Sequence, residues 1–278
     1  MTKLQEYIKL INRSHEQTLK VADRIGVEPA LQILKGAREQ LLDKLYKLRS
    51  QSGRWTYTLT KQTLAQINKE YMELQRLLIQ HGGRAFPSIA EMTTDRFLDT
   101  LQAADKLFTG IVTPLQMTEA SYMTYIAGKA TGSVLRHYKS SIQRYGLETI
   151  EKIERHMSKS LLAKDDTMHV IHGIQDIIGG NEYKAERIFR TETASAYGRT
   201  HQVALQEAKR DLPDMKKIWS TSEDDKVCDC CNSLDNKVVG TNQEFICSSG
   251  KTTFSVLHEP LHPSCRCSTA PWRSAWEK

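Results

Sequence analysis

Six cysteines are the residues of this 278-residue chain best suited to chemistry, and all six lie within the last 51 residues. Cys228 and Cys231 form a C-x2-C pair, and His262 opens the segment HPSCRC 31 residues after Cys231. Two ligands on a tight turn and a second pair from a distant turn are a common way to build a tetrahedral zinc site, because zinc prefers thiolate and imidazole ligands. The polar loop between the pairs would be closed by the metal.

The expected ligands of this structural Zn²⁺ are Cys228, Cys231, His262 and either Cys267 or Cys265. We favour Cys267, because alternation along a strand would turn one of the last two cysteines inward and the other outward. Three further side chains compete for the same places: Cys230, Cys247 and His258. The alternative is a set of free, buried or partly paired cysteines. A catalytic zinc is disfavoured, because no H-E-x-x-H or H-x-E element is present.

A second polar feature lies upstream, in the segment that contains Arg190 and Glu192. Arg190 follows Glu186 by four residues, which is a favourable spacing for an ion pair on a helix. Glu192 has no such partner, so we expect its carboxylate to accept hydrogen bonds from the backbone or from Arg266. A catalytic carboxylate is the alternative, but no second acid, nucleophile or phosphate loop accompanies it. Both residues are therefore predicted to make structural polar contacts, with no catalytic or cofactor-binding residue assigned.

Several short segments occur in an order that resembles a known family: RIFRTET (187–193), IWST (218–221), DDKVCDCC (224–231), LDN (234–236), Phe245 and HPSCRC (262–267). Together they resemble the phage head-morphogenesis family, the Mu protein F-like minor head proteins, over roughly residues 150–272. Asn236 departs from the glycine usual in the family, but asparagine tolerates a left-handed turn almost as well. The first 140 residues carry no matching motif.

The resemblance implies a non-enzymatic minor head protein of a tailed phage or prophage. Such proteins bind the portal, lie in the virion or prohead, and assist head assembly and DNA packaging or delivery. The implied partners are the portal protein, with capsid or scaffold protein and DNA as further ones, and assembly would take place in the bacterial host cytoplasm. Two alternatives stay open: a zinc-containing DNA-binding protein, and a toxin-like transferase of the kind that some family members carry as an extra domain.

Apolar periodicity predicts that helices position the cysteine region. Residues 1–110 are expected to be helical, with breaks near 52–54 and 82–93, where Gly82-Gly83 and Pro87 interrupt the pattern. Later helices are expected near 118–145, 147–162, 166–178 and 182–210, divided at Gly146 and at Gly179-Gly180.

Short strands are expected near 217–221, 237–240 and 265–270, so the predicted fold class is mainly α with a small C-terminal α+β module stabilised by zinc. Three regions follow: an N-terminal helical region (1–110), a connecting helical region (111–149) and a head-morphogenesis domain with the Cys/His module (150–278). Residues 1–110 are expected to supply the partner surface, and 150–272 the folding anchor. The alternative is that the N-terminal helices complete one compact domain.

Positive charge is concentrated in the first part of the chain. Residues 1–150 carry 21 Lys and Arg against 14 Asp and Glu, whereas residues 151–278 carry 18 against 19. This excess permits contact with nucleic acid, although a solvated helical surface explains it equally well. No apolar stretch of about 18 residues occurs, so no membrane partner is expected. The N-terminus lacks a secretory signal, which favours a reducing cytoplasm and therefore metal binding over disulfides.

Overall fold

The computed structural model describes residues 2–47, 54–113, 120–222, 227–249, 252–263 and 265–277. The chain is mainly helical (76%), with a small C-terminal module rich in strands and cysteines, which confirms the predicted fold class in these respects. It divides into two compact units. Unit 1 comprises Met1–Gly26, Arg84–Leu135 and Arg190–Lys278, and unit 2 comprises Val27–Gly83 and Arg136–Phe189. Each of the three predicted regions contributes residues to both units.

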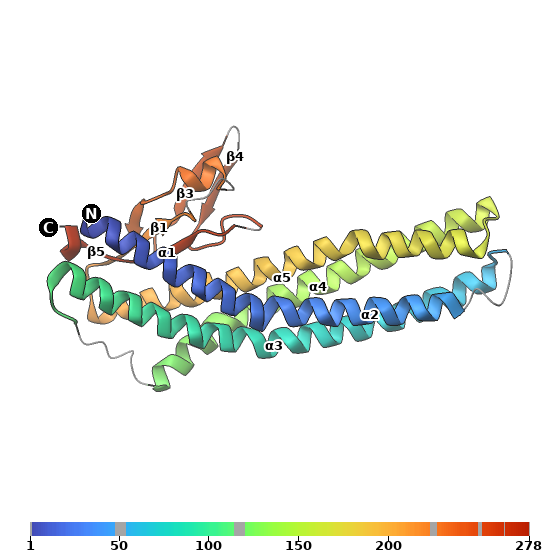
Figure 1. The fold of residues 1–278 in the computed structure, drawn as a ribbon, viewed down its shortest axis with the longest axis horizontal. Coiled ribbons are helices and arrows are strands. Elements are labelled where there is room, and N and C mark those ends of the chain that lie inside the picture. The colour runs from blue at the N-terminus through green and yellow to red at the C-terminus, as the bar shows by residue number, and fades with distance from the viewer. Residues whose placement is uncertain are drawn as a thin grey trace. The chain divides into compact units, whose positions relative to one another are not determined.

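Long helices make up most of the described chain (Figure 1): α1 (Lys3–Ala22), α2 (Glu28–Lys47), α3 (Tyr57–Thr109), α4 (Ala120–Ala163) and α5 (Thr167–Asp211), with a π-helical turn (Asp23–Val27) after α1. Local sequence explains where two of them begin. The Thr2 side chain accepts a hydrogen bond from the Gln5 amide, and the Gln5 side chain accepts one from the Thr2 amide, which forms a capping box for α1. The Asp166 carboxylate likewise accepts from the amides of Met168 and His169 at the start of α5.

The predicted helix breaks after residue 80 are wrong. Helix α3 continues through Gly82-Gly83 and Pro87, α4 continues through Gly146, and α5 continues through Gly179-Gly180. Around Pro87, the side chains of Phe86, Ile89 and Ala90 are buried. Burial of this apolar face therefore keeps the helix intact although proline removes one backbone hydrogen bond.

Two of the glycines are contact points between helices of unit 2. A Cβ atom on Gly82 would overlap the ring of Tyr138, whose hydroxyl donates to the Leu78 carbonyl at 3.0 Å. A Cβ atom on Gly146 would overlap the side-chain amide of Gln75. Glycine therefore serves close packing of α3 against α4 at these positions and does not end either helix.

Unit 2 is a bundle of helical segments from α2, α3, α4 and α5. Its interior is filled by aliphatic and aromatic side chains at helical spacing. The buried set includes Leu41, Leu45, Ile67, Leu78, Ile142, Ile153, Met157, Ile171 and Ile174. These residues explain why the periodicity of the sequence predicted helices correctly here.

Unit 1 carries the strands. β1 (Met215–Ser220), β2 (Val238–Gly240) and β5 (Ser268–Arg273) form an antiparallel sheet in the order β2-β1-β5, with Ile218 opposite both Val238 and Ala270. A hairpin that the sequence analysis did not predict, β3 (Phe245–Ser249) and β4 (Thr252–Val256), stands apart from this sheet (Figure 1). A one-turn helix, α6 (Asp229–Asn232), precedes β2, and a 3-10 turn (Ser274–Glu277) follows β5.

Strand β1 separates two apolar clusters of unit 1. Ile218 lies in a core that includes Tyr7 of α1, Phe97 of α3 and Leu205 of α5. Its neighbour Trp219 lies in a second cluster, which contains five of the cysteines. Because α1 and the end of α3 complete the first core, these two helical segments belong to one compact unit with the C-terminal strands.

A buried carboxylate ties the C-terminal residues to α3. Asp105 accepts hydrogen bonds from the Arg273 guanidinium at 2.8 Å and from the Trp276 indole at 3.0 Å. Trp276 also stacks on Phe108 at a ring separation of 5.2 Å. The end of the chain is therefore part of the core of unit 1.

Candidate metal centre

The first pair of candidate ligands lies on the short helix α6. Cys228 is its N-cap residue, and its Sγ atom accepts a hydrogen bond from the Cys231 amide at 3.4 Å. One helical turn separates the two cysteines, so both thiols point to the same side. The C-x2-C spacing therefore produces the knuckle that the sequence predicted.

The second group comes from the turn before β5. The Cys265 amide donates to the His262 carbonyl at 3.1 Å, which closes this turn. The Nδ1 atom of His262 lies 2.9 Å from the Pro263 carbonyl, and since a carbonyl only accepts, Nδ1 carries the proton. This leaves Nε2 with its lone pair directed at the cysteines, as a metal ligand requires.

Three distances between the donor atoms are those of a tetrahedral metal site. With Zn–S of about 2.3 Å and Zn–N of about 2.0 Å, tetrahedral geometry requires about 3.8 Å between two sulfurs and about 3.5 Å between sulfur and nitrogen. His262 Nε2 lies 3.4 Å from Cys228 Sγ and 3.3 Å from Cys231 Sγ. Cys231 Sγ lies 3.8 Å from Cys265 Sγ. The residues present therefore fit a zinc ion.

The donors form two overlapping groups that share Cys231. One is Cys228, Cys231 and His262, the other is Cys231, Cys265 and Cys267, and the donor atoms of each lie within 4.8 Å of one another. They surround a hollow of about 220 Å³, lined by Ser222, Val227, Cys228, Cys231, His262, Cys265, Arg266 and Cys267. The two groups together contain five donors, but among the described residues no four of them all lie within 4.8 Å of one another.

Strand alternation does not distinguish Cys267 from Cys265, so the prediction that one thiol points inward and the other outward is wrong. Strand β5 begins at Ser268, so neither cysteine lies in a strand. Both side chains are buried, Cys265 at 8% and Cys267 at 5% exposure. Irregular backbone before β5 turns both thiols inward, which periodicity cannot predict.

The remaining two cysteines are paired. Cys230 of α6 and Cys247 of β3 form a disulfide, and the other four cysteines are free thiols. Two candidate ligands, Cys230 and Cys247, are thereby removed from the metal site. The structure combines the two alternatives that the sequence left open, partly paired cysteines and a cluster able to hold a metal.

Hydrogen bonds within the cluster shift the thiol pKa values. Partial burial opposes ionisation of Cys228, but the Cys231 amide and the His262 imidazole outweigh it and lower the pKa of the Cys228 thiol. In the close pair of Cys231 and Cys265, the hydrogen bond between the two thiols lowers the pKa of Cys265 and raises that of Cys231. Thiolates are the form that binds metal, so the contacts that lower the pKa of Cys228 and Cys265 favour metal uptake.

The LDN segment shapes the chain between α6 and β2. Leu234 is buried, and the Asp235 carboxylate accepts a hydrogen bond from the Thr221 amide at 2.9 Å. Asn236 adopts a left-handed backbone with φ of 60°, and its amide donates to the Trp219 carbonyl at 2.9 Å. The prediction that asparagine replaces glycine in a left-handed turn is therefore confirmed.

Arg190 and Glu192 lie on α5 within unit 1. Arg190 forms an ion pair with Asp23 of the π-helical turn, at 2.9 Å, a partner that the sequence analysis did not identify. Glu192 is buried, with 3% exposure. Burial suits a carboxylate that receives hydrogen bonds, and the structural role of both residues stays a prediction.

A buried network of polar side chains, which the sequence analysis missed, supports the module. Lys217 of β1 is fully buried and donates to Gln202 of α5 at 3.1 Å and to the Leu257 carbonyl. Gln202 in turn donates to the Thr241 carbonyl at 2.8 Å. Burial lowers the pKa of Lys217 to about 8. No local signal marks a lysine as buried, because its partners are distant in sequence.

The same region buries Glu259 and two histidines. Thr269 donates to the Glu259 carboxylate at 2.7 Å, and burial raises the pKa of Glu259 to about 7. Burial lowers the pKa of His15 to about 4 and that of His201 to about 3, so both imidazoles are neutral at physiological pH. Lys217 and Thr269 thus attach the 257–261 segment to β1 and β5 through hydrogen bonds to Leu257 and Glu259.

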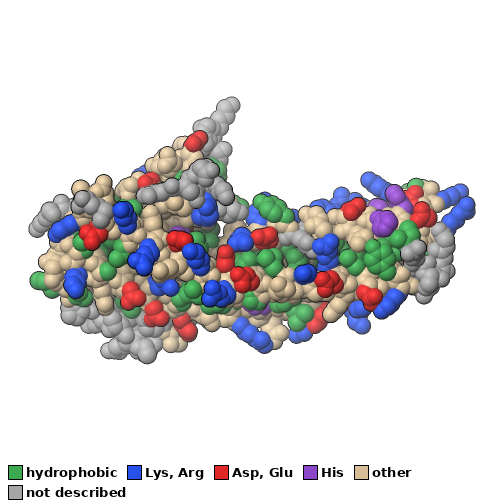
Figure 2. Space-filling view, viewed as in Figure 1, with side chains coloured by type: hydrophobic (Ala, Val, Ile, Leu, Met, Phe, Trp, Pro, Cys, Tyr) green, Lys and Arg blue, Asp and Glu red, His purple; other side chains and the backbone are tan. Residues whose placement is uncertain are grey.

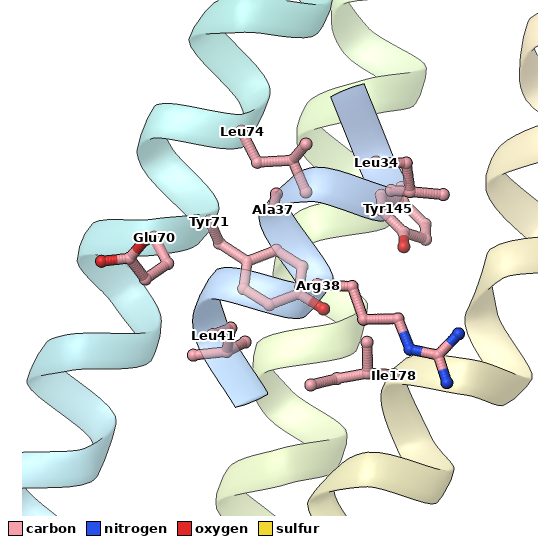
Figure 3. Close-up of a pocket in the computed structure, with 9 residues that line it drawn as sticks. All are labelled: Leu34, Ala37, Arg38, Leu41, Glu70, Tyr71, Leu74, Tyr145 and Ile178. Carbon is pink, nitrogen blue, oxygen red and sulfur yellow. The ribbon is translucent and has the colours of Figure 1, made fainter. Parts of the chain in front are cut away.

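Unit 2 contains a separate, apolar hollow of about 320 Å³ (Figure 3). Side chains from α2, α3, α4 and α5 line it, with the Tyr71 ring near its centre and the Glu70 carboxylate pointing away. Glu70 is paired with Lys44 at 2.5 Å. A hollow without convergent polar groups suits packing of an apolar side chain better than catalysis.

The surface charge is mixed. On the face drawn in Figure 2, basic and acidic side chains are interspersed, without a continuous basic patch. None of the helices within the described residues combines the length and apolar character needed to cross a bilayer. The positive excess of residues 1–150 is thus not gathered into one patch on this face.

These features define a mainly helical protein whose C-terminal module contains four thiols and an imidazole in two overlapping groups that could hold a metal ion. Residues 133–270, about half of the chain, match the family model described as phage Mu protein F like protein. This match confirms the resemblance and is consistent with a phage head-morphogenesis protein in the broad sense. Comparison with curated proteins and with solved structures gave no significant match.

Proposed function

We propose that this chain is a minor head protein of a tailed phage or prophage, which binds the portal, aids head assembly and DNA packaging or delivery, and performs no catalysis. The family match carries the proposal, since it covers the metal module and the segments around it. The donor set supports a structural role, because cysteine thiols and an imidazole from two turns are typical of a structural zinc site. Residence in the virion or prohead follows from the same family assignment.

The proposed metal is a structural Zn²⁺ held by Cys228, Cys231, His262 and Cys265, with Cys267 as the alternative fourth ligand. The metal would clip α6 to the turn before β5 and so close the long loop between them. Metal analysis of the purified full chain tests this: we expect one zinc per chain, lost in Cys231→Ser and kept in the exposed control His172→Ala. Full loading of Cys267→Ser with loss in Cys265→Ser would assign the fourth ligand. Substoichiometric zinc, with no change in stability under chelator, would contradict the site.

Portal binding is tested by co-purification. The tagged full chain is co-expressed with the portal protein encoded by the same phage, and separately with its capsid and scaffold proteins. We expect the portal protein to be retained at a defined ratio. Retention of capsid or scaffold protein alone would overturn the portal assignment, and absence of the chain from purified particles by mass spectrometry would overturn its place in the virion.

Residues 1–110 are proposed to supply the partner surface. Large apolar side chains on α3 are exposed there, Tyr57 at 62% and Met72 at 71%. Charged substitutions, Tyr57→Lys and Met72→Lys, should weaken portal retention at least tenfold without loss of folding. Leu162→Lys on α4 is the matched control, since Leu162 is 84% exposed but lies outside the proposed surface. Equal weakening by the control would contradict the assignment.

Direct DNA contact is the second candidate function, and the excess of basic residues in 1–150 permits it. A gel shift at increasing salt distinguishes it from portal binding alone. Contacts to several phosphates must weaken steeply as salt rises, because each contact releases a counterion. If no gel shift occurs at low salt, DNA is excluded as a direct partner and the portal protein stays the proposed one.

A further inference from the structure

Neighbouring cysteines of α6 have separate partners. Cys230 is joined to Cys247 of β3, whereas Cys231 faces His262 and Cys265 on the other side of the short helix. All of these cysteines belong to one buried cluster around Trp219. A disulfide and a metal-binding thiol set therefore lie next to each other in one small module.

When no metal is present, the pair Cys230 and Cys247 competes for the oxidant with the thiols of Cys231, Cys265 and Cys267. Six cysteines allow 15 fully paired connectivities. Cys231 and Cys265 are only 3.8 Å apart, so a modest approach would join them in a bond of about 2.05 Å. Such a bond would consume two candidate zinc ligands, and Cys267 in the same group offers a further wrong pairing.

We propose that metal loading directs the disulfide chemistry of this module, so that Cys230 and Cys247 alone are left to pair. The inference rests on the metal site proposed above. A bound ion coordinates the thiolates of its ligands and withholds them from attack on an oxidant, because the free thiolate is the nucleophile. Cys230–Cys247 is then the site of oxidation, and the metal is the reason for its specificity.

The reaction with a small disulfide such as oxidised glutathione balances without further reagents. One thiolate, of Cys230 or Cys247, attacks a sulfur of glutathione disulfide and releases one glutathione thiolate. The second cysteine, as its thiolate, then attacks the protein sulfur of the mixed disulfide and releases the second glutathione. The two protein thiols are oxidised, one glutathione disulfide is reduced, and the two protons leave with the two glutathione molecules.

The Cys230–Cys247 disulfide restrains the β3–β4 hairpin. At its base, Phe245 is buried against Trp219 at a ring separation of 5.1 Å. Further along β3, Cys247 is the next buried residue, and the neighbouring Ile246 is 53% exposed. A two-stranded hairpin is marginal by itself, so it opens locally and gives an oxidant access. The disulfide supplies a second attachment, directly to the metal-bearing helix α6.

The consequence is a change in the module between two environments. The glutathione pool of a bacterial cytoplasm keeps an accessible pair of this kind reduced, while a metal site persists there. After release from the cell, oxidation closes the pair and fixes the hairpin. The module is thus held by metal alone during assembly and by metal plus disulfide in the free particle.

The experiment uses the full chain purified in reductant and divided into zinc-loaded and chelated samples. Zinc content is measured first, reductant is removed, and both samples receive excess oxidised glutathione. Peptide mass spectrometry under non-reducing conditions then maps the disulfides. We expect at least ninety per cent of the bonded cysteine in the zinc-loaded sample to be Cys230–Cys247. The chelated sample should give a mixture that includes Cys231–Cys265.

Two variants separate loss of the disulfide from loss of zinc. Cys247→Ser should bind zinc fully and form no internal disulfide when loaded, whereas Cys231→Ser should lose zinc and mispair. Hydrogen exchange of β3 and β4 amides should slow at least tenfold on oxidation of the loaded wild-type protein and not in Cys247→Ser. If the loaded sample contains one zinc per chain but the loaded and chelated wild-type samples give the same disulfide map, the inference is overturned and the metal site stands. Substoichiometric zinc overturns the metal site and the inference with it.

Discussion

The imidazole of His15 donates a hydrogen bond from Nε2 to the carbonyl of Arg266 at 3.0 Å, which joins α1 to the backbone between Cys265 and Cys267. The two residues are 251 positions apart. The ring of His15 also packs against Tyr197 of α5 at 5.0 Å. The first helix of the chain therefore supports the segment that carries Cys265 and Cys267, the last two candidate metal ligands.

Loss of the His15 side chain should destabilise unit 1 and the metal site together. We expect His15→Ala to lower the free energy of unfolding by about 2 kcal/mol, because a buried hydrogen bond and a packed ring are both removed. It should also speed loss of bound zinc to a chelator. His137→Ala, at an exposed position on α4, is the control and should change stability by less than about 0.5 kcal/mol.

Urea unfolding and metal-release kinetics measure both effects.

The same reasoning predicts that a chain beginning near residue 115 aggregates, since it lacks α1 and the part of α3 that complete the core. A soluble, zinc-loaded fragment would show instead that the C-terminal part folds alone.

Adjacent glycines of α3 should respond in opposite ways to alanine. Gly82→Ala should destabilise unit 2, because the new methyl group would overlap the Tyr138 ring. Gly83→Ala should stabilise it by about 0.5–1 kcal/mol, since alanine is the better helix former and nothing lies within 4 Å of its Cβ. Equal effects in urea denaturation would show that Tyr138 does not pack on Gly82.

The turn at Asn236 should discriminate among substitutions by backbone conformation alone. The residue is exposed and has φ of 60°, so Asn236→Gly should be neutral or slightly stabilising. Asn236→Val should cost about 1–2 kcal/mol, because a branched side chain is strained in this region. Thermal unfolding measures both variants, and a neutral valine would rule out the left-handed turn.

Glu259 should make stability depend on pH. Its folded pKa is raised to about 7 from 4.5 by burial, so between these values the folded state holds a proton that the unfolded state has released. The contribution of Glu259 to the free energy of unfolding is therefore fully present below about pH 4.5 and is lost as pH rises through about 7. Glu259→Gln removes this loss, and its stability relative to wild type should rise by up to about 3 kcal/mol between about pH 5 and pH 8.

Denaturant titrations at several pH values test this prediction. Glu151→Gln is the control, because Glu151 is exposed on α4 and paired with Arg155 at its surface. Its stability relative to wild type should stay flat over the same range. A flat difference for Glu259→Gln as well would show that the carboxyl is ionised in the folded protein throughout.

The sequence by itself determined the features that depend on short-range spacing. Helical periodicity identified most of the helical residues, the C-x2-C spacing placed Cys228 and Cys231 on one knuckle, and the ordered motifs led to the family. The left-handed turn at Asn236 was equally local. In each case the signal lies within one turn or one short motif, where backbone geometry leaves little choice.

Tertiary structure alone decided which of these residues meet. Gly82 and Gly146 read as helix breaks in the sequence, yet they are contact points because a side chain from another helix fills the space beside each. Partition of the cysteines into a disulfide and a metal-binding group depends on β3 reaching α6, which no spacing encodes. The same holds for Lys217, Glu259 and His15, because each forms a hydrogen bond to a group distant in sequence that helps to offset the cost of its burial.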